Sequence, residues 1–143
     1  AVNIDLTPFK GPAAKNGFEV ITPVTEDGYT FTVDKSSGAT APGYYEYNGA
    51  GTIRLYANNT LNIKGAAIAK IVFTINTATG AKRYANFNPN TGKVDDQASG
   101  DTSITWTGNS SDITFTVGAT SIGTEAGKPG QGHIQQIEIY PAK

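Results

Sequence analysis

The sequence predicts an all-β fold, a two-sheet antiparallel β-sandwich, and three observations lead to this prediction. Apolar and polar residues alternate with period two in many short segments, which is typical of half-buried strands. Gly, Asn, Pro and Asp, which favour turns, separate these segments. Thr, Asn, Gly and Tyr are abundant while strong helix formers are scarce, so we expect no helix of useful length.

Each expected strand is a short run of alternating residues with β-branched or aromatic side chains, bounded by turn residues. In chain order, the expected strands are Val2–Leu6, Phe18–Ile21, Tyr29–Val33, Tyr44–Tyr47, Thr52–Ala57, Thr60–Lys64, Ile68–Ile75, Arg83–Phe87, Ser103–Thr107, Asp112–Val117 and Gly132–Tyr140. The segments rich in Gly, Ser, Thr, Asn or Pro between them are expected to be surface loops. These loops are Asp34–Gly43, Asn76–Lys82, Asn88–Asp101 and Thr120–Gly130.

One connection carries a more specific turn signal. Asn58 and Asn59 lie between two alternating segments, and Asn tolerates the positive φ angles of a two-residue turn. The sequence therefore predicts a hairpin tip over Tyr56–Thr60.

The alternation also predicts which side chains share a face, because successive residues of a strand point to opposite sides. In Thr52–Ala57, Ile53 and Leu55 are expected in the core, which places Arg54 and Tyr56 together on the opposite surface. The same rule predicts further core positions at Ala57, Leu61, Ile63, Ile71, Phe73, Ile75, Ile113, Phe115 and Val117.

Length and charge limit the classes of protein to consider. The 143 residues are expected to form a single domain, 1–143, without an internal linker. Eleven basic and twelve acidic side chains give a net charge of -1 with no basic stripe, which argues against nucleic acid as a partner. No apolar run approaches the roughly 20 residues of a membrane span. The chain begins at Ala1 and contains no Met, so we expect a processed protein or a domain excised from a longer one. A β-protein rich in Thr, Asn and Gly and without Cys is typical of secreted or surface-exposed bacterial proteins, and we expect a monomer.

Catalytic motifs are missing from the sequence, which therefore predicts a protein that is not an enzyme. There is one histidine, His133, expected as a structural or strand-edge residue rather than a catalytic base. A glycosidase needs two carboxylates about 5 to 10 Å apart. Nothing in the spacing of the acidic residues pairs them. The candidates are Glu19, Glu26, Asp27, Glu46, Asp95, Asp96, Glu125 and Glu138.

No cofactor is expected, and metal binding is left open. Asp34, Asp95 and Asp96 can supply oxygen ligands for calcium, but no calcium-loop motif surrounds them, which favours solvated loop acids. A structural calcium near the chain ends, held by Asp5 or Glu138, is kept as an alternative.

Aromatic residues give the clearest functional signal. Tyr44, Tyr45 and Tyr47 lie in one short strand, so both of its faces carry at least one tyrosine. Proteins bind sugars with aromatic faces that stack on the pyranose ring, flanked by polar side chains for the hydroxyls. Arg54, Tyr56 and either Tyr44 or Tyr45 can form such a set. A structural ion pair or packing role for Arg54 is the alternative.

Trp106, Tyr84 and Asn86 complete the candidate ligand-binding residues. Trp106 shares a face with Ile104, which favours a core position over a binding platform. Tyr84 and Asn86 alternate with Ala85 and Phe87 and are expected to face outward.

Several segments together resemble a known kind of domain. They are Thr52–Ile63, Ile68–Thr74, Ile104–Gly108, Ile113–Val117 and Gly132–Tyr140. As an ordered set, they resemble accessory β-sandwich domains of secreted or surface-anchored glycan-degrading proteins of gut and rumen bacteria, which are similar in layout to jelly-roll carbohydrate-binding modules. The resemblance covers roughly Tyr29 to Tyr140.

The resemblance implies an extracellular location and a parent protein with an attached catalytic domain. Together with the aromatic residues, it suggests a non-catalytic module that binds a plant-type polysaccharide or oligosaccharide, such as a xylan or β-glucan. The alternative is a structural or adhesive β-sandwich module of a bacterial surface protein.

Overall fold

A computed structural model describes residues 1–14, 17–47, 50–76, 83–98 and 100–143. These residues form antiparallel strands and one short 3-10 helix, η1 (Thr7–Phe9). The strands are β1 (Val2–Ile4), β2 (Lys10–Ala14), β3 (Gly17–Val20), β4 (Val24–Glu26), β5 (Tyr29–Asp34), β6 (Gly43–Tyr47), β7 (Ala50–Tyr56), β8 (Thr60–Ile75), β9 (Phe87–Pro89), β10 (Lys93–Val94), β11 (Ser103–Val117) and β12 (Gln131–Pro141). The prediction of an all-β antiparallel fold is confirmed.

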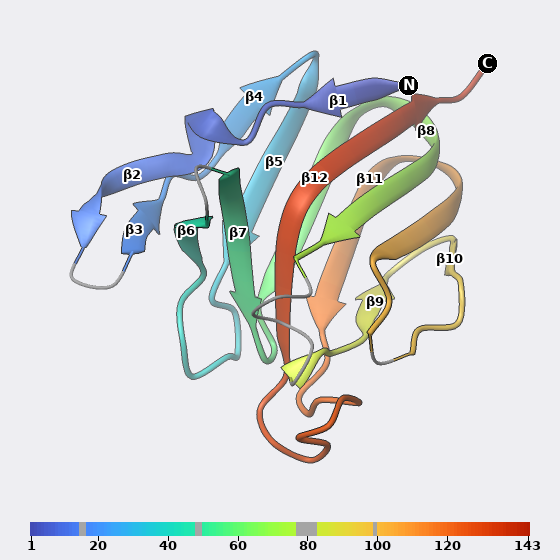
Figure 1. The fold of residues 1–143 in the computed structure, drawn as a ribbon. Coiled ribbons are helices and arrows are strands. Elements are labelled where there is room, and N and C mark those ends of the chain that lie inside the picture. Colours follow the sequence, from blue (N-terminus) through green and yellow to red (C-terminus); the bar gives the residue numbers. More distant parts are fainter. Residues whose placement is uncertain (15–16, 48–49, 77–82, 99) are drawn as a thin grey trace.

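The described strands belong to one continuous, strongly curled sheet (Figure 1). Its main path runs β10-β11-β8-β12-β7-β6-β3-β2, while β1 pairs with β12, β5 joins β4 to β8, and β9 pairs with β11. Because β1 runs antiparallel to β12, the two chain ends lie at the same end of the molecule (Figure 1). A division into the two sheets of a jelly-roll sandwich stays a prediction.

The curl of the sheet comes from its two longest strands. Residues 60–64 of β8 pair with β5 and with the second half of β11, whereas residues 68–75 pair with β12 and with the first half of β11. The β8–β11 ladder shifts register between Thr107 and Asp112, opposite the segment between the two halves of β8. Such irregularities bend a strand and increase its twist, so each long strand carries the sheet around the core.

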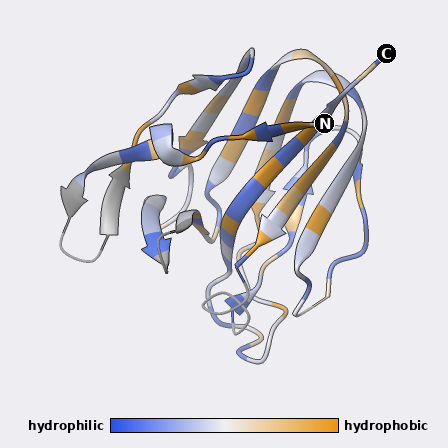
Figure 2. Cartoon of the chain, turned by 45° about the horizontal axis from the view of Figure 1, so that its top comes forward, coloured by the Kyte–Doolittle hydropathy of each residue, from blue (hydrophilic) through white to orange (hydrophobic). Residues whose placement is uncertain are grey.

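The core fills the hollow of the curled sheet. Alternating hydrophobic and hydrophilic residues run along the strands, as Figure 2 shows. Phe73 is fully buried and makes edge-to-face contacts with Phe87 and Phe115, at centroid distances of 5.6 and 5.0 Å. The alternation rule is confirmed at Ile53, Leu55, Leu61, Ile63, Ile71, Phe73, Ile75, Ile113, Phe115 and Val117, all of which are buried. The core position predicted for Ala57 is wrong, because Ala57 is only half-buried and lies in the turn after β7.

The observed strands differ from the predicted ones mainly at the two longest strands, β8 and β11, and at several short strands. Thr60–Lys64 and Ile68–Ile75 form one strand, as do Ser103–Thr107 and Asp112–Val117, because the chain bends between the halves without leaving the ladder. The short strands β2, β4 and β10 were not predicted. Two or three residues cannot display a period-two pattern, and β2 contains Gly and Pro instead of alternating side chains.

The turn predicted at Asn58 is confirmed, but the hairpin is wrong. Asn58 has a φ of 63°, and the side chain of Asn59 caps the turn by accepting a hydrogen bond from the Tyr56 nitrogen at 2.8 Å. The strands β7 and β8 that flank this turn do not pair with each other, because β12 lies between them in the sheet. Asn59 is buried, and its side-chain amide donates hydrogen bonds to the backbone carbonyls of Lys35 and Thr40. These bonds connect the turn to a neighbouring loop.

The predicted strand Arg83–Phe87 is also wrong. Tyr84 makes an isolated bridge with Gln131, and regular pairing begins only at Phe87, the first residue of β9. Tyr84 and Ala85 are both buried, so the period-two alternation does not hold across this segment. The expected loop Asn76–Lys82 lies outside the described residues from 77 onward.

Candidate functional site

The register of β6, β7 and β12 brings the predicted aromatic and basic residues together. Ile53 and Leu55 of β7 are buried in the core, so Arg54 and Tyr56 point to the opposite, outer face of the sheet. Tyr45 of β6 lies opposite Thr52 and therefore shares that face. Tyr45, Arg54 and Tyr56 form what we call the outer patch.

Arg54 links the two tyrosines of the outer patch. Its guanidinium carbon lies 3.9 Å from the centroid of the Tyr45 ring, which is a cation–π contact. Its Nη1 donates a long hydrogen bond to the Tyr56 hydroxyl at 3.4 Å. A hydrogen bond with Tyr56, followed by partial burial, raises the pKa of the Tyr45 phenol. All three side chains are half-buried, so each is held in place while part of it faces solvent.

Gly43 provides room for this arrangement. It lies opposite Arg54 in the β6–β7 ladder, and a Cβ there would be only 2.9 Å from the ring of Tyr45. The Tyr45 ring thus lies back over its own strand, close to the guanidinium. A side chain at position 43 would push the ring away from Arg54.

His133 and Gln131 of β12 border the outer patch, since they lie opposite Arg54 and Tyr56 in the ladder. His133 is buried, and its Nε2 is 3.1 Å from the Gln131 Oε1. Burial and, secondarily, the charge of Arg54 lower the pKa of His133 to about 4. The imidazole is therefore neutral at pH 7 and packs beside Arg54. This position agrees with the structural role that the sequence predicts for His133.

Two of the predicted site aromatics, Tyr44 and Trp106, lie in the core. Tyr44 is only 2% exposed, because it pairs with Ile53 and faces inward with it. Trp106 is fully buried, its indole Nε1 donating to the Thr91 carbonyl at 2.7 Å, as favoured by its alternation with Ile104. Neither Tyr44 nor Trp106 therefore contributes a ring to the outer patch.

The outward orientation predicted for Tyr84 is wrong. Its ring is 2% exposed, and burial raises the pKa of its hydroxyl, which has no hydrogen-bond partner within the described part of the chain. Asn86 is half-buried. Its backbone carbonyl accepts a hydrogen bond from the Gly118 nitrogen at 2.8 Å, beside the loop that follows β11. The alternation failed here because this segment is not a regular strand.

A second cation–π pair on the outer face was not predicted. Lys70 of β8 lies opposite Tyr140 of β12, with its Nζ 4.9 Å from the ring centroid. The Tyr140 hydroxyl donates a hydrogen bond to Glu138 at 3.4 Å. Only the pairing of strands distant in sequence identifies such a contact, because Lys70 and Tyr140 are 70 positions apart.

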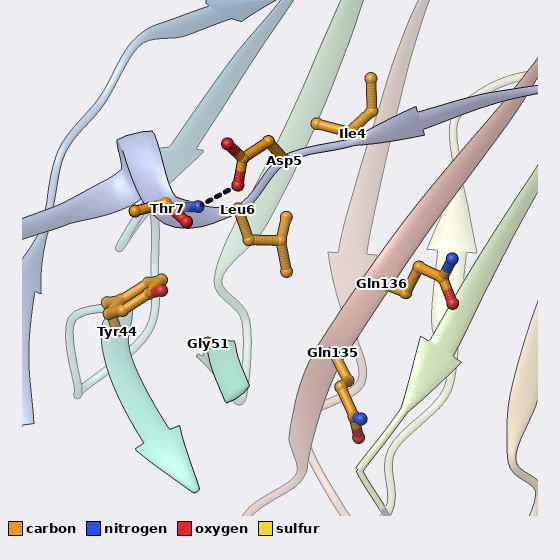
Figure 3. A pocket seen from close by; sticks show the side chains of 8 residues that line it. All are labelled: Ile4, Asp5, Leu6, Thr7, Tyr44, Gly51, Gln135 and Gln136. Atoms are coloured by element: carbon orange, nitrogen blue, oxygen red, sulfur yellow. Dashed lines mark hydrogen bonds between the residues drawn. The ribbon is translucent and has the colours of Figure 1, made fainter. Parts of the chain in front are cut away.

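The structure also contains a pocket of about 280 Å³ between the end of β1 and the start of β7 (Figure 3). Tyr44 lines this pocket, but the other residues of the pocket were not predicted to bind a ligand. They are Ile4, Asp5, Leu6, Thr7, Gly51, Gln135 and Gln136. No local sequence signal marks this pocket, because it arises where four separate segments meet.

The acidic residues do not assemble a metal site within the described ranges. No group of three or more His, Cys, Asp or Glu side chains is found there. Three carboxylates instead pair with cations: Glu46 with Lys10 at 2.9 Å, Glu125 with Arg83 at 2.6 Å, and Asp112 with Lys64 at 4.0 Å. No helix in the described residues is long and apolar enough to cross a membrane.

Comparisons with protein-family models, with curated protein sequences and with solved structures give no match to this chain. Any functional argument must therefore come from the side chains and their arrangement.

Proposed function

We propose that this chain is a non-catalytic carbohydrate-binding module, of jelly-roll type, that binds a plant-type polysaccharide such as a xylan or β-glucan. The outer patch is the observation that carries this proposal, because it joins two tyrosine rings and a guanidinium on one face of the sheet. The module would act outside the cell as a monomer, keeping an attached catalytic domain near its substrate.

The chemistry of the outer patch suits a neutral glycan. A pyranose has apolar C–H faces that pack against aromatic rings and hydroxyls that accept hydrogen bonds from a guanidinium. The cation–π contact with Tyr45 and the bond to Tyr56 limit the rotamers of Arg54, so less conformational entropy is lost when a ligand binds.

Affinity gel electrophoresis tests this proposal. The domain is run through gels containing xylan, mixed-linkage β-glucan, glucomannan, cellulose derivatives or pectin, with and without a calcium chelator. We expect retardation by xylan or β-glucan that is insensitive to salt, because a neutral ligand forms no ion pairs for salt to screen. Calcium-dependent retardation would instead support the structural calcium that the sequence left open.

Two substitutions of Tyr56 sharpen the test. Tyr56→Ala removes a central aromatic contact and should weaken binding by at least about tenfold, whereas Tyr56→Phe keeps the ring and should retain most of the affinity. The matched control is Thr32→Ala on β5, a half-buried residue of the outer face away from the outer patch. If Thr32→Ala and Tyr56→Ala have equal effects, the ligand does not bind at the outer patch.

Burial of Tyr44, Tyr84 and Trp106 favours the alternative of a structural or adhesive module. These rings pack in the core and add no aromatic face to the outer patch, which leaves less aromatic surface for binding there. Equal migration of the wild-type domain in every gel would reject the carbohydrate proposal and support this alternative.

A further inference from the structure

The pocket next to β12 exists because two strands share one edge of β12 and do not meet. β7 pairs with residues 131–134 of β12, and β1 pairs with residues 137–139. Gln135 and Gln136 lie between these two ladders, where the pairing of β12 with β8 also shifts register. The gap therefore follows from the strand pairing. The segment that follows β1 closes the gap on one side.

The residues around this gap combine an apolar floor with a polar rim. Ile4 and Leu6 are buried, and the Tyr44 ring lies beside Gly51, where the absence of a Cβ leaves space for the phenol. Asp5 and Thr7 are exposed above this floor, as is Gln135 on the opposite side (Figure 3). The accessible lining is mainly polar, so hydrogen bonds rather than apolar contacts would hold a ligand there.

The rim offers both kinds of hydrogen-bonding group. One oxygen of Asp5 accepts a hydrogen bond from the Thr7 nitrogen at 3.0 Å, which fixes the carboxylate at the mouth of the pocket. The Thr7 hydroxyl can donate and accept, and the Gln135 amide supplies two donors and an acceptor. A ligand that carries several hydroxyls on a compact ring matches this mixture of donors and acceptors.

Charge narrows the class of ligand. The hydrogen bonds from Thr7 lower the pKa of Asp5, so its carboxylate is ionised at neutral pH. The nearby Glu46 is paired with Lys10 at 2.9 Å, which leaves Asp5 as the main charge at the rim. An anionic sugar would be repelled by this carboxylate, whereas a neutral sugar can donate a hydroxyl to it.

We propose that this pocket is a second carbohydrate subsite, which binds one neutral sugar ring at the end of an oligosaccharide chain. Its volume of about 280 Å³ lies just below the usual range for ligand pockets, which suits a single ring. The inference rests on the proposed function for the class of ligand, but it concerns different residues from those of the outer patch. Tyr44 and Tyr45 point to opposite faces of β6, so the two sites are separate.

NMR titration of the isotope-labelled domain with xylose, glucose, galactose, mannose and glucuronic acid tests this inference. We expect at least one neutral sugar to shift the amide signals of Thr7, Gly51 and Gln135, with millimolar affinity because few contacts are made. Glucuronic acid should cause no such shifts. If no sugar shifts these signals, or if glucuronic acid binds as well as the neutral sugars, the inference is overturned.

Two pocket variants and one control localise the effect. Asp5→Asn keeps an oxygen acceptor for the Thr7 nitrogen but removes the charge, and it should weaken binding of the neutral sugar by about tenfold. Gln135→Ala truncates an exposed side chain and should also weaken binding. Asp96→Asn makes the same change at an exposed acid outside the pocket and should have no effect. Equal affinities for Asp5→Asn, Gln135→Ala and Asp96→Asn would contradict the proposed site.

The two proposals can fail independently. Tyr56→Ala should abolish retardation in polysaccharide gels while leaving the sugar-induced shifts at Thr7 unchanged. Retardation without any shift in the pocket would reject the second subsite alone, and shifts in the pocket without retardation would reject the outer patch alone.

Discussion

Two regions of the same sheet follow the same alternating pattern yet expose different chemistry. In β5 and β11, the aromatic residues Tyr29, Phe31 and Phe115 all face the core. In β6 and β7, Tyr44 faces the core, while Tyr45 and Tyr56 lie on the outer face with Arg54 between them. The inner faces are alike, so the difference between the regions lies in the outer residues.

The outer face of β5, β8 and β11 is polar, and its groups bond to one another. Asn62 donates to Asp112 at 2.7 Å and to the Thr114 hydroxyl at 2.9 Å, and the hydroxyls of Thr25 and Thr30 are 3.0 Å apart. A ligand there would have to compete with these bonds. The comparison indicates that a polar surface is not in itself a sugar site, and that ring and guanidinium together are what distinguish the outer patch.

The largest expected effect is on the free energy of unfolding, and it distinguishes aromatic residues that face the core from those on the outer face. Phe115→Ala removes a fully buried ring that contacts Phe73 at 5.0 Å and should reduce the free energy of unfolding by about 3 to 5 kcal/mol. Tyr56→Ala, at a half-buried position, should cost about 1 kcal/mol. Urea unfolding followed by circular dichroism measures both, and similar losses would show that Tyr56 is a core residue.

The next largest effect is the pH dependence of stability that arises from His133, which packs beside Arg54. His133 has a pKa of about 4 in the folded protein and 6.5 when unfolded, so the unfolded chain binds more protons between these values. The folded state thus has its full stability above about pH 6.5 and loses about 3 kcal/mol as the pH falls to about 4.

Comparison with His133→Gln tests this pH dependence. Urea unfolding at several pH values between 4 and 7.5 should give a flatter profile for the variant than for the wild type, because the variant has no imidazole to protonate. Carboxylates titrate in both proteins, so the difference between the two profiles isolates His133. Parallel profiles would mean that Arg54 and burial do not depress its pKa.

The smallest effect is expected on the polar face. Asn62→Ala breaks the bonds to Asp112 and Thr114 and should reduce the free energy of unfolding by about 1 kcal/mol, since solvent can replace these partners. Retardation by polysaccharide should not change. A loss of retardation in this variant would place the glycan on β8 and β11 instead of the outer patch.

Much of the architecture and part of the candidate site could be predicted from the sequence. The shared face of Arg54 and Tyr56, the core positions of β7, β8 and β11, and the preference of Trp106 for the core all followed from alternation within one strand. Tyr84 was misplaced because the rule was applied to a segment without regular pairing. The hairpin at Asn58 failed because a turn signal specifies local dihedral angles, whereas β12 inserts between the flanking strands.

The sequence by itself therefore determined what is local: an all-β chain, the faces of its strands and the conformation of a turn. A period of two follows from the geometry of the extended backbone and requires no knowledge of neighbouring strands. Only the tertiary structure decided which strands pair, and with them the meeting of Tyr45 with Arg54 and the gap at Gln135. These features depend on the register between segments far apart in sequence, which is set by burial of the whole core.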